Sequence, residues 1–201
     1  VILTPKSLLH HGPCSSSLES IEEGTMFSEI LVDEDFNNSA KLSSQTGLTS
    51  TTAFRQLIEQ DNRVPQVAVK RVLLCSGKVS YDLRQGRRKR KLGSSVVIVR
   101  FEQLAPFPFE QMSWLSQQYP NAEFVWVQEE PKNLGFWTHV QPPINLALRD
   151  KASVDAVCHR DGSKRTARFV GRPISASSAP GCFNVHREGQ KQLIDEAFAG
   201  L

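Results

Sequence analysis

The chain is poor in cysteine and has no long apolar run. The longest apolar runs, such as residues 96–99, have the length of a core strand, whereas a membrane-spanning helix needs roughly 20 apolar residues. The cysteines at positions 14, 75, 158 and 182 form no CxxC pair and no CxxH spacing. This spacing argues against a disulfide framework and a structural zinc site, and it indicates a reducing compartment.

Catalytic and nucleotide-binding motifs are missing as well. The histidines show no HxxxH spacing, and the chain has neither a GxSxG elbow nor a GxGxxG or full phosphate-loop pattern. The net charge of +3 is modest, and much of it comes from residues 84–91. A nucleic-acid-binding protein is therefore not indicated, and the residues by themselves predict no catalytic site.

What is present suffices for one domain with a real core, since 39% of the 201 residues are hydrophobic. We predict an N-terminal arm over residues 1–66, with an edge strand at residues 27–32 and a loop or flexible insertion at the polar residues 37–52. The regular domain then covers residues 67–201. The start at Val1 rather than Met suggests a segment of a longer protein, and no signal peptide is visible.

Apolar runs and helical spacing alternate from residue 67 onward. Strands are predicted at residues 67–75, 95–101, 123–128 and 168–171, and helices at residues 79–91, after Pro108, at residues 134–148 and at the C-terminus. Gly86 weakens the first helix, and Pro142 and Pro143 interrupt the third. The alternation predicts parallel strands joined by crossover helices, in a three-layer α/β/α domain with about five strands.

Two positively charged segments are candidate anion sites. Ser76, Gly77 and Lys78 follow a buried strand and open a helix, a position at which α/β domains bind anions. The alternative, which we favour, is that Gly77 makes a tight turn and Lys78 is solvated. The basic run at residues 87–91 is interpreted as a solvated helix end, because no aromatic residues interleave with it.

An acidic segment closes the predicted strand at residues 123–128. Glu129 and Glu130 are adjacent, so on a strand they point to opposite sides and do not form an acid–base pair. With Asn133, Phe136 and Trp137 they resemble a contact surface with aromatic anchors. Phe136 and Trp137 could equally be core residues, and both interpretations stay open.

Several short motifs, taken in order, resemble the C-terminal region of the 2-oxoglutarate dehydrogenase first-component subunit. They span nearly the whole chain. One such motif alone would be weak evidence for the family, but the ordered set is specific. The matching motifs lie at residues 4–9, 71–83, 100–108, 119–123, 126–135, 170–173 and 195–198. Residues 37–52 and 157–164 depart from the family pattern.

The resemblance implies a fold like the transketolase C-terminal domain, with a mixed five-stranded sheet. It implies a parent enzyme of the tricarboxylic acid cycle that decarboxylates 2-oxoglutarate with thiamine diphosphate and Mg²⁺ and succinylates the lipoyl group of a partner acyltransferase. This sequence lacks the family's metal and diphosphate motif, so the chain alone is expected to be inactive, without catalytic, cofactor or metal ligands. A 2-oxoadipate-type dehydrogenase domain and a non-catalytic α/β binding module are the alternatives.

The resemblance also implies partners. It implies a homodimer, for which Glu129, Glu130, Asn133, Phe136 and Trp137 are the interface candidates. An acyl-CoA effector site is implied by some family members, with Lys78, Lys6 and Arg100 as the anion contacts. No nucleic acid or membrane is expected as a partner, and the mitochondrial matrix is preferred over the bacterial cytoplasm as the location.

Overall fold

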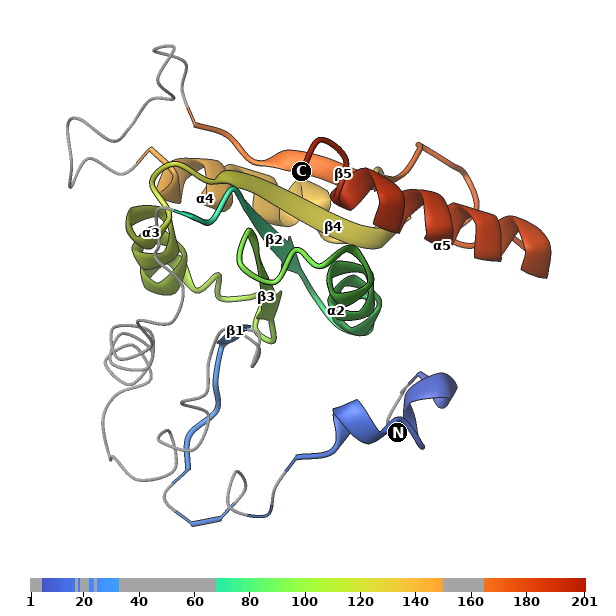
Figure 1. Cartoon of the computed structure of the whole chain (residues 1–201), viewed down its shortest axis with the longest axis horizontal. Helices are drawn as coiled ribbons and strands as arrows, with labels where there is room; N and C mark the ends of the chain where they lie inside the picture. Colours follow the sequence, from blue (N-terminus) through green and yellow to red (C-terminus); the bar gives the residue numbers. More distant parts are fainter. Residues whose placement is uncertain (1–4, 17, 19–21, 24, 33–67, 150–164) are drawn as a thin grey trace.

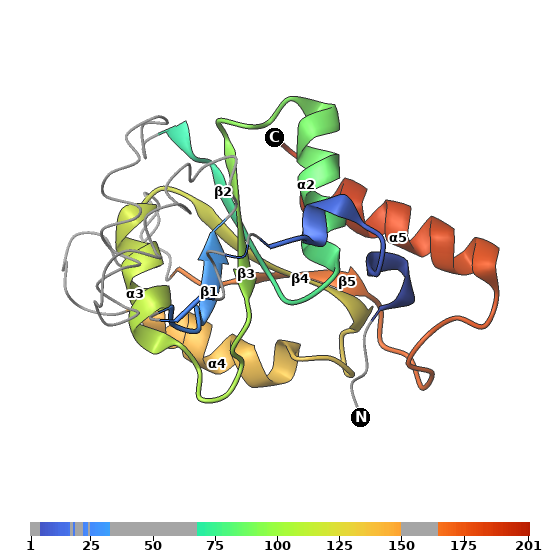
Figure 2. The same cartoon turned by 90° about the horizontal axis from the view of Figure 1, so that it is seen from below.

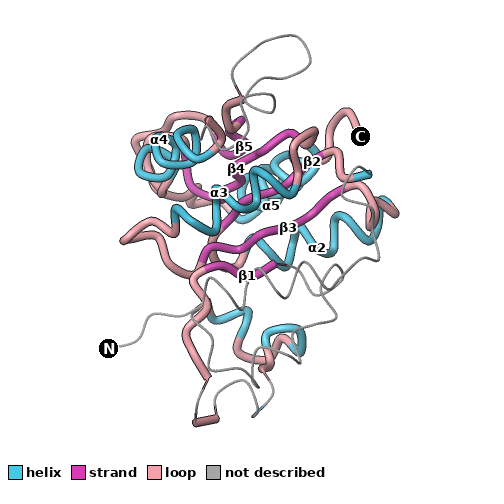
Figure 3. Tube along the Cα trace, turned by 90° about the vertical axis from the view of Figure 1, so that its left-hand side faces the viewer, coloured by secondary structure: helices cyan, strands magenta, loops and turns pink. Residues whose placement is uncertain are grey.

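The fold is taken from a computed structural model, which describes residues 5–16, 18, 22–23, 25–32, 68–149 and 165–201. These residues form a five-stranded sheet in the order β1-β3-β2-β4-β5, as Figures 1 and 3 show. The strands are β1 (Ile30–Val32), β2 (Arg71–Cys75), β3 (Val96–Phe101), β4 (Glu123–Pro131) and β5 (Arg168–Arg172).

The strand directions make the sheet mixed. The edge strand β1 runs antiparallel to β3, whereas β2 is parallel to both β3 and β4, and β4 is parallel to β5. The predicted mixed, mostly parallel α/β sheet is therefore confirmed, including its edge strand. That strand is shorter than predicted, since it begins at Ile30 and leaves Phe27 exposed.

Helices cover both faces of this sheet. The longer ones are α2 (Val79–Arg90), α3 (Phe109–Gln118), α4 (Trp137–Ala147) and α5 (Phe183–Ala197), and two short 3-10 helices, η1 (Lys6–Leu8) and η2 (Gly12–Cys14), lie in the N-terminal part. Figure 2 shows α3 and α4 on one side of the sheet and α2 and α5 on the other. The three-layer arrangement is thus confirmed.

The alternation of β2 side chains divides the core into two halves. Val72 and Leu74 pack with α3 and α4, whereas Leu73 and Cys75 pack with α2 and α5. Successive side chains of a strand point to opposite faces, and here both faces are covered. This is why every residue of β2 is buried and why its sequence is almost continuously apolar.

Two prolines lie inside α4, where an interruption was predicted. Pro142 and Pro143 are both part of the helix, which continues to Ala147. Each proline removes a backbone donor and costs about 3 kcal/mol in an isolated helix interior. The buried face of α4, formed by Trp137, Val140, Ile144 and Ala147, packs into the core and offsets that cost. The predicted interruption was therefore wrong.

Close packing of α2 on α5 explains Gly86. A Cβ atom at Gly86 would lie 2.8 Å from Ile194 Cγ2, so a glycine lets the two helices approach. The next residue corrects the interpretation of the basic run in part, since residues 88–91 are exposed as predicted but Arg87 is not. Arg87 is only 1% exposed, and its Nη1 donates to the carbonyl of Val96 at 3.1 Å.

Three of the predictions concern residues outside the described part of the chain. This applies to the polar loop at residues 37–52, the proposed domain boundary at residue 66, and the departure from the family pattern at residues 157–164. Among the described residues, no helix is long and apolar enough to cross a membrane.

Candidate functional site at the carboxyl ends of the strands

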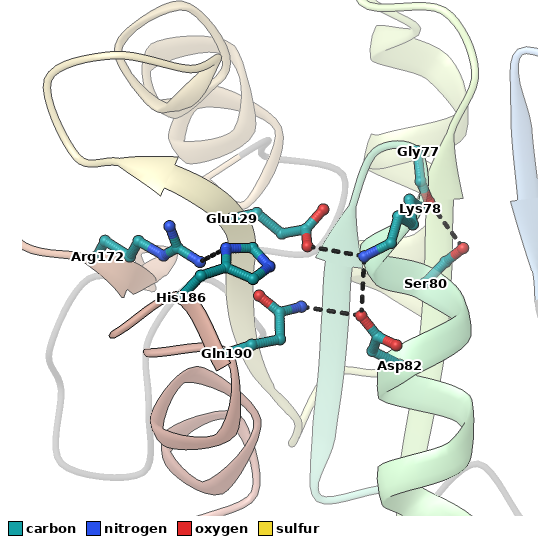
Figure 4. A network of polar contacts seen from close by, with 8 residues as sticks. All are labelled: Gly77, Lys78, Ser80, Asp82, Glu129, Arg172, His186 and Gln190. Atoms are coloured by element: carbon teal, nitrogen blue, oxygen red, sulfur yellow. Dashed lines mark hydrogen bonds and ion pairs between the residues drawn. The ribbon is translucent and has the colours of Figure 1, made fainter. Parts of the chain in front are cut away.

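The connections leaving β2 and β4 diverge at the carboxyl ends of these neighbouring strands. The chain passes from β2 to α2 on one face of the sheet and from β4 to α4 on the other. In open α/β sheets, ligands bind where adjacent connections diverge in this way. A polar network from β4, β5, α2 and α5 lies at this end of the sheet (Figure 4).

Lys78 is the centre of one half of the network. Gly77 makes the turn after β2 with a φ of 71°, which places Lys78 at the start of α2. The Lys78 Nζ atom lies 3.1 Å from Glu129 Oε1 on β4 and 3.4 Å from Asp82 Oδ2 one turn along α2. Gln190 of α5 donates to the same Asp82 oxygen at 2.9 Å. The favoured alternative is thus confirmed for Gly77, which makes the tight turn, but not for Lys78, whose ammonium is shared by two carboxylates.

The carboxylates also determine the protonation of Lys78. Partial burial by itself lowers the pKa of the Lys78 ammonium, but the charges and hydrogen bonds of Glu129 and Asp82 outweigh burial, and the net pKa is raised. The Lys78 ammonium is thus already paired with two carboxylates. An added anion would have to compete with both carboxylates for it.

Arg172 and His186 form the other half. The Arg172 Nη2 atom lies 3.0 Å from His186 Nδ1, and because arginine only donates, this ring nitrogen acts as the acceptor. Figure 4 shows the imidazole between Arg172 and Gln190. Within the described part of the chain, the buried atoms Arg172 Nε and Gln190 Oε1 have no hydrogen-bond partner. These groups were not predicted from the sequence, although the place of Arg172 at the carboxyl end of β5 could have pointed to that residue.

Arg100 lies beside the same loop but in a second cluster. Its Nη1 donates to Tyr81 at 3.1 Å and contacts Ser80 Oγ at 3.5 Å, while its Nε pairs with Glu102. Ser80 in turn donates to the carbonyl of Gly77 at 2.8 Å. Burial lowers the pKa of Arg100, but Glu102 and Tyr81 raise it in sum.

The structure brings together only part of the predicted anion site. Ser80 connects Arg100 to the loop of Lys78, whereas Lys6 is exposed on η1. Tyr81 also contacts the N-terminal segment, because the ring of His11 meets it edge-on at 5.4 Å. The N-terminal segment is therefore held near this loop by His11.

The five interface candidates fall into different environments. Glu129 pairs with Lys78, and Glu130 is exposed on the same strand, which runs to Pro131 rather than ending at residue 128. Asn133 is exposed but bonds to Ser175, and Phe136 is 49% exposed. Trp137 is only 5% exposed and packs on Phe169. For Trp137, then, the structure favours the core over the interface.

Gln128 organises this segment, and sequence reasoning missed it. Its Oε1 accepts from Trp126 Nε1 and from the backbone N–H of Trp137, each at 3.0 Å. Its Nε2 donates to the carbonyls of Pro131 at 3.1 Å and Glu130 at 3.3 Å. A Cβ atom at Gly135, whose φ is 37°, would lie 2.6 Å from that nitrogen. The QEEP segment at residues 128–131 and the NLG segment at residues 133–135 thus form one compact turn around the Gln128 side chain.

The chemistry of the Lys78 half of the network is that of paired charges. In the described ranges, no group of three or more His, Cys, Asp or Glu side chains could hold a metal ion. The carboxylates of Glu129 and Asp82 both pair with the Lys78 ammonium, so they do not form an open site for a metal ion. The arrangement is suited to holding β2, β4, α2 and α5 together at the carboxyl end of the sheet.

Comparison with known proteins gives one family. The family model described as "2-oxoglutarate dehydrogenase C-terminal" matches residues 42–198. The chain is 36% identical over 202 residues to the 2-oxoglutarate dehydrogenase E1 component of Cupriavidus necator, covering 100% of this chain and 17% of that protein.

Two further relatives extend the comparison. The chain is 32% identical over 197 residues to the 2-oxoglutarate dehydrogenase E1 component of Brucella anthropi, covering 98% of this chain and 17% of that protein. It is 33% identical over 199 residues to the probable 2-oxoadipate dehydrogenase complex component E1 homolog of Dictyostelium discoideum, covering 98% of this chain and 18% of that protein. The chain thus spans less than a fifth of the length of these relatives.

Proposed function

This chain belongs to the 2-oxoglutarate dehydrogenase C-terminal family, and from that membership we propose that it is the C-terminal supporting domain of a longer 2-oxo acid dehydrogenase polypeptide. The longer polypeptide oxidatively decarboxylates 2-oxoglutarate and passes the succinyl group to the lipoyl group of a partner acyltransferase. The observation that carries the proposal is full-length similarity of the chain to a minor part of much longer E1 components.

The proposal places thiamine diphosphate and Mg²⁺ outside this chain. Mg²⁺ is bound through carboxylate and phosphate oxygens in octahedral geometry. Glu129 and Asp82 already share the Lys78 ammonium, so this pair does not fit such a site. What this chain contributes is a five-stranded sheet with internal ion pairs at its carboxyl end.

Activity of the longer polypeptide tests the proposal. Supplied with thiamine diphosphate and Mg²⁺, it should release CO2 from 2-oxoglutarate and succinylate a lipoyl domain. The 201-residue chain alone should do neither. A longer polypeptide that turns over no 2-oxo acid would contradict the proposal.

A 2-oxoadipate-type parent is the second candidate, because the Dictyostelium relative carries that description. The two substrates differ by one methylene, and one methylene in a pocket is worth about 1–3 kcal/mol of discrimination. The ratio of kcat/KM for 2-oxoglutarate and 2-oxoadipate therefore decides between them. A preference of at least about ten-fold for either acid assigns the substrate.

We further propose a homodimeric parent in the mitochondrial matrix. Of the interface candidates, Glu130 on β4 offers accessible surface for the second subunit. An acyl-CoA effector response through Lys78, Arg100 and Lys6 is part of the same proposal. Lys78→Ala should weaken that response in the longer polypeptide while leaving basal turnover unchanged. An unchanged effector response would remove Lys78 from the site.

A further inference from the structure

Two stretches without Lys, Arg, Asp or Glu meet at the carboxyl ends of β4 and β5. They run from residue 133 to 148 and from 173 to 186, and they are the two longest such stretches in a chain that is 22% charged. Lys132 N–H donates to the carbonyl of Arg172 at 3.0 Å, at the boundary of the two stretches. Asn133 and Ser175 then exchange two hydrogen bonds of 3.0 and 3.1 Å. The stretches are therefore continuous, and we call their joined surface the uncharged face.

Large apolar side chains stand out from the uncharged face. Phe136 is 49% exposed, Ile174 74% and Phe183 72%. Figure 1 shows the first turns of α5 projecting beyond the sheet. The buried residues of α5, Leu193 and Ala197, lie in its second half. The first half thus presents largely exposed apolar side chains, and the Arg187 guanidinium lies over the Phe183 ring, with its Cζ atom 5.9 Å from the ring centroid. Exposed apolar side chains of this kind mark interaction surfaces.

We propose that the uncharged face is the docking surface for the preceding domains of the longer polypeptide. This inference rests on the proposed function. Obligate interfaces are large and apolar and are depleted of charged residues at their centre. The relatives supply the occupant, since more than four fifths of each of them lies outside the part that this chain matches.

The chemistry of the occupant follows from that of the face. A charged partner surface would lose its hydration here without meeting a counter-charge, which is costly. The partner surface is therefore apolar and uncharged at its centre. The basic C-terminal end of α2, with Arg88 and Lys89 exposed, belongs to the part of the domain that stays in solvent.

A native cysteine reports on this docking. Cys182 is exposed at the start of α5, inside the uncharged face. Its modification by a maleimide is followed by mass spectrometry in the 201-residue chain and in the longer polypeptide. Because thiol reactivity depends on access, Cys182 should react at least about ten-fold more slowly in the longer polypeptide. A cysteine introduced as Lys89→Cys, outside the face, should react within about two-fold of the same rate in both.

A substitution in the uncharged face tests the same contact in a second way. Phe183→Glu should restore rapid labelling of Cys182 in the longer polypeptide, because it places a charge in the proposed contact. Leu9→Glu, at an exposed apolar residue outside the face, should not. Both substitutions are at exposed positions, so the melting temperature of the 201-residue chain should not change.

The outcomes separate the docking surface from the proposed function. Equal Cys182 rates in the two proteins overturn the docking surface, and CO2 release from 2-oxoglutarate by the same sample then still supports the function. If Cys182 is protected in a longer polypeptide that is inactive, the docking surface is supported and the proposed function is contradicted. A 201-residue chain that is dimeric by light scattering, and whose Cys182 becomes reactive on dilution, has a second copy on the face, which also overturns the proposal.

Discussion

At the scale of single residues, Gln128 shows how one buried amide shapes a long segment. Its four hydrogen bonds reach Trp126, Trp137 and the carbonyls that end β4. The sequence could point to the QEEP segment only by resemblance. Periodicity identifies the strand, but it does not reveal that the amide of Gln128 folds back onto the turn that follows.

Gln128→Leu should destabilise the 201-residue chain strongly. It leaves the buried Trp126 indole N–H and the Trp137 backbone N–H without their acceptor, and each buried polar group left unpaired costs about 1–3 kcal/mol. We expect a loss of about 2–4 kcal/mol in the free energy of unfolding, measured by urea denaturation. Glu130→Gln, at the exposed neighbour, is the control and should stay within about 0.5 kcal/mol of the wild type. If Gln128→Leu changed the unfolding free energy as little as the control does, the hydrogen bonds of Gln128 would not be needed for stability.

Glu123 gives the domain a pH-dependent contribution to stability. It accepts from Arg71 Nε and Arg168 Nε, both at 2.6 Å, and Arg71 also donates to the carbonyl of Ala197 at 2.8 Å. Burial alone raises the pKa of the Glu123 carboxyl, but Arg168 and Arg71 outweigh it, and the net pKa is lowered. A lowered folded pKa means that the stabilisation is complete above the unfolded value of about 4.3 and is lost as the pH falls through the folded pKa.

Glu123→Gln tests this contribution. After discounting for solvent screening, we expect a loss of about 1 kcal/mol at pH 7, or roughly 2–4 °C in Tm. The difference in Tm between wild type and variant should stay constant above about pH 5.5 and shrink below about pH 4.3. A difference that persists unchanged in acid would assign the effect to packing rather than to charge.

At the scale of secondary-structure elements, the α2–α5 contact depends on Gly86. Gly86→Leu forces a side chain against Ile194, which lies 2.8 Å from the position of a Cβ atom. Overpacking of this kind costs about 1–3 kcal/mol despite the better helix propensity of leucine. Gln85→Leu, at an exposed neighbour, should change the unfolding free energy by less than about 0.5 kcal/mol. Equal stability of the two variants would contradict the close helix packing.

Secondary-structure elements were predictable from the sequence where burial on both faces produces a continuous apolar run. The strands β2 and β3 are buried on both faces, so their apolar runs identify them directly. Proline gave the wrong indication in α4, because local propensity does not include the buried face that Trp137 and Ile144 provide. Within the basic run the solvated interpretation holds for residues 88–91 and fails only at Arg87, because the burial of Arg87 depends on the position of β3 in space.

At the scale of the whole molecule, the carboxyl end of the sheet combines two opposite surfaces. One is the network of Lys78, Glu129 and Asp82, in which charges are paired within the domain. The other is the uncharged face, where apolar side chains such as Phe183 remain uncovered. A domain that satisfies its own charges and exposes an apolar face is suited to supporting a larger enzyme rather than to acting alone.

Isothermal titration of thiamine diphosphate with Mg²⁺ into the 201-residue chain and into the longer polypeptide tests this role most directly. We predict binding in the micromolar range for the longer polypeptide and no measurable binding for the 201-residue chain. Micromolar binding to the 201-residue chain would contradict the account, because the cofactor would then be held by the domain to which we assign only support.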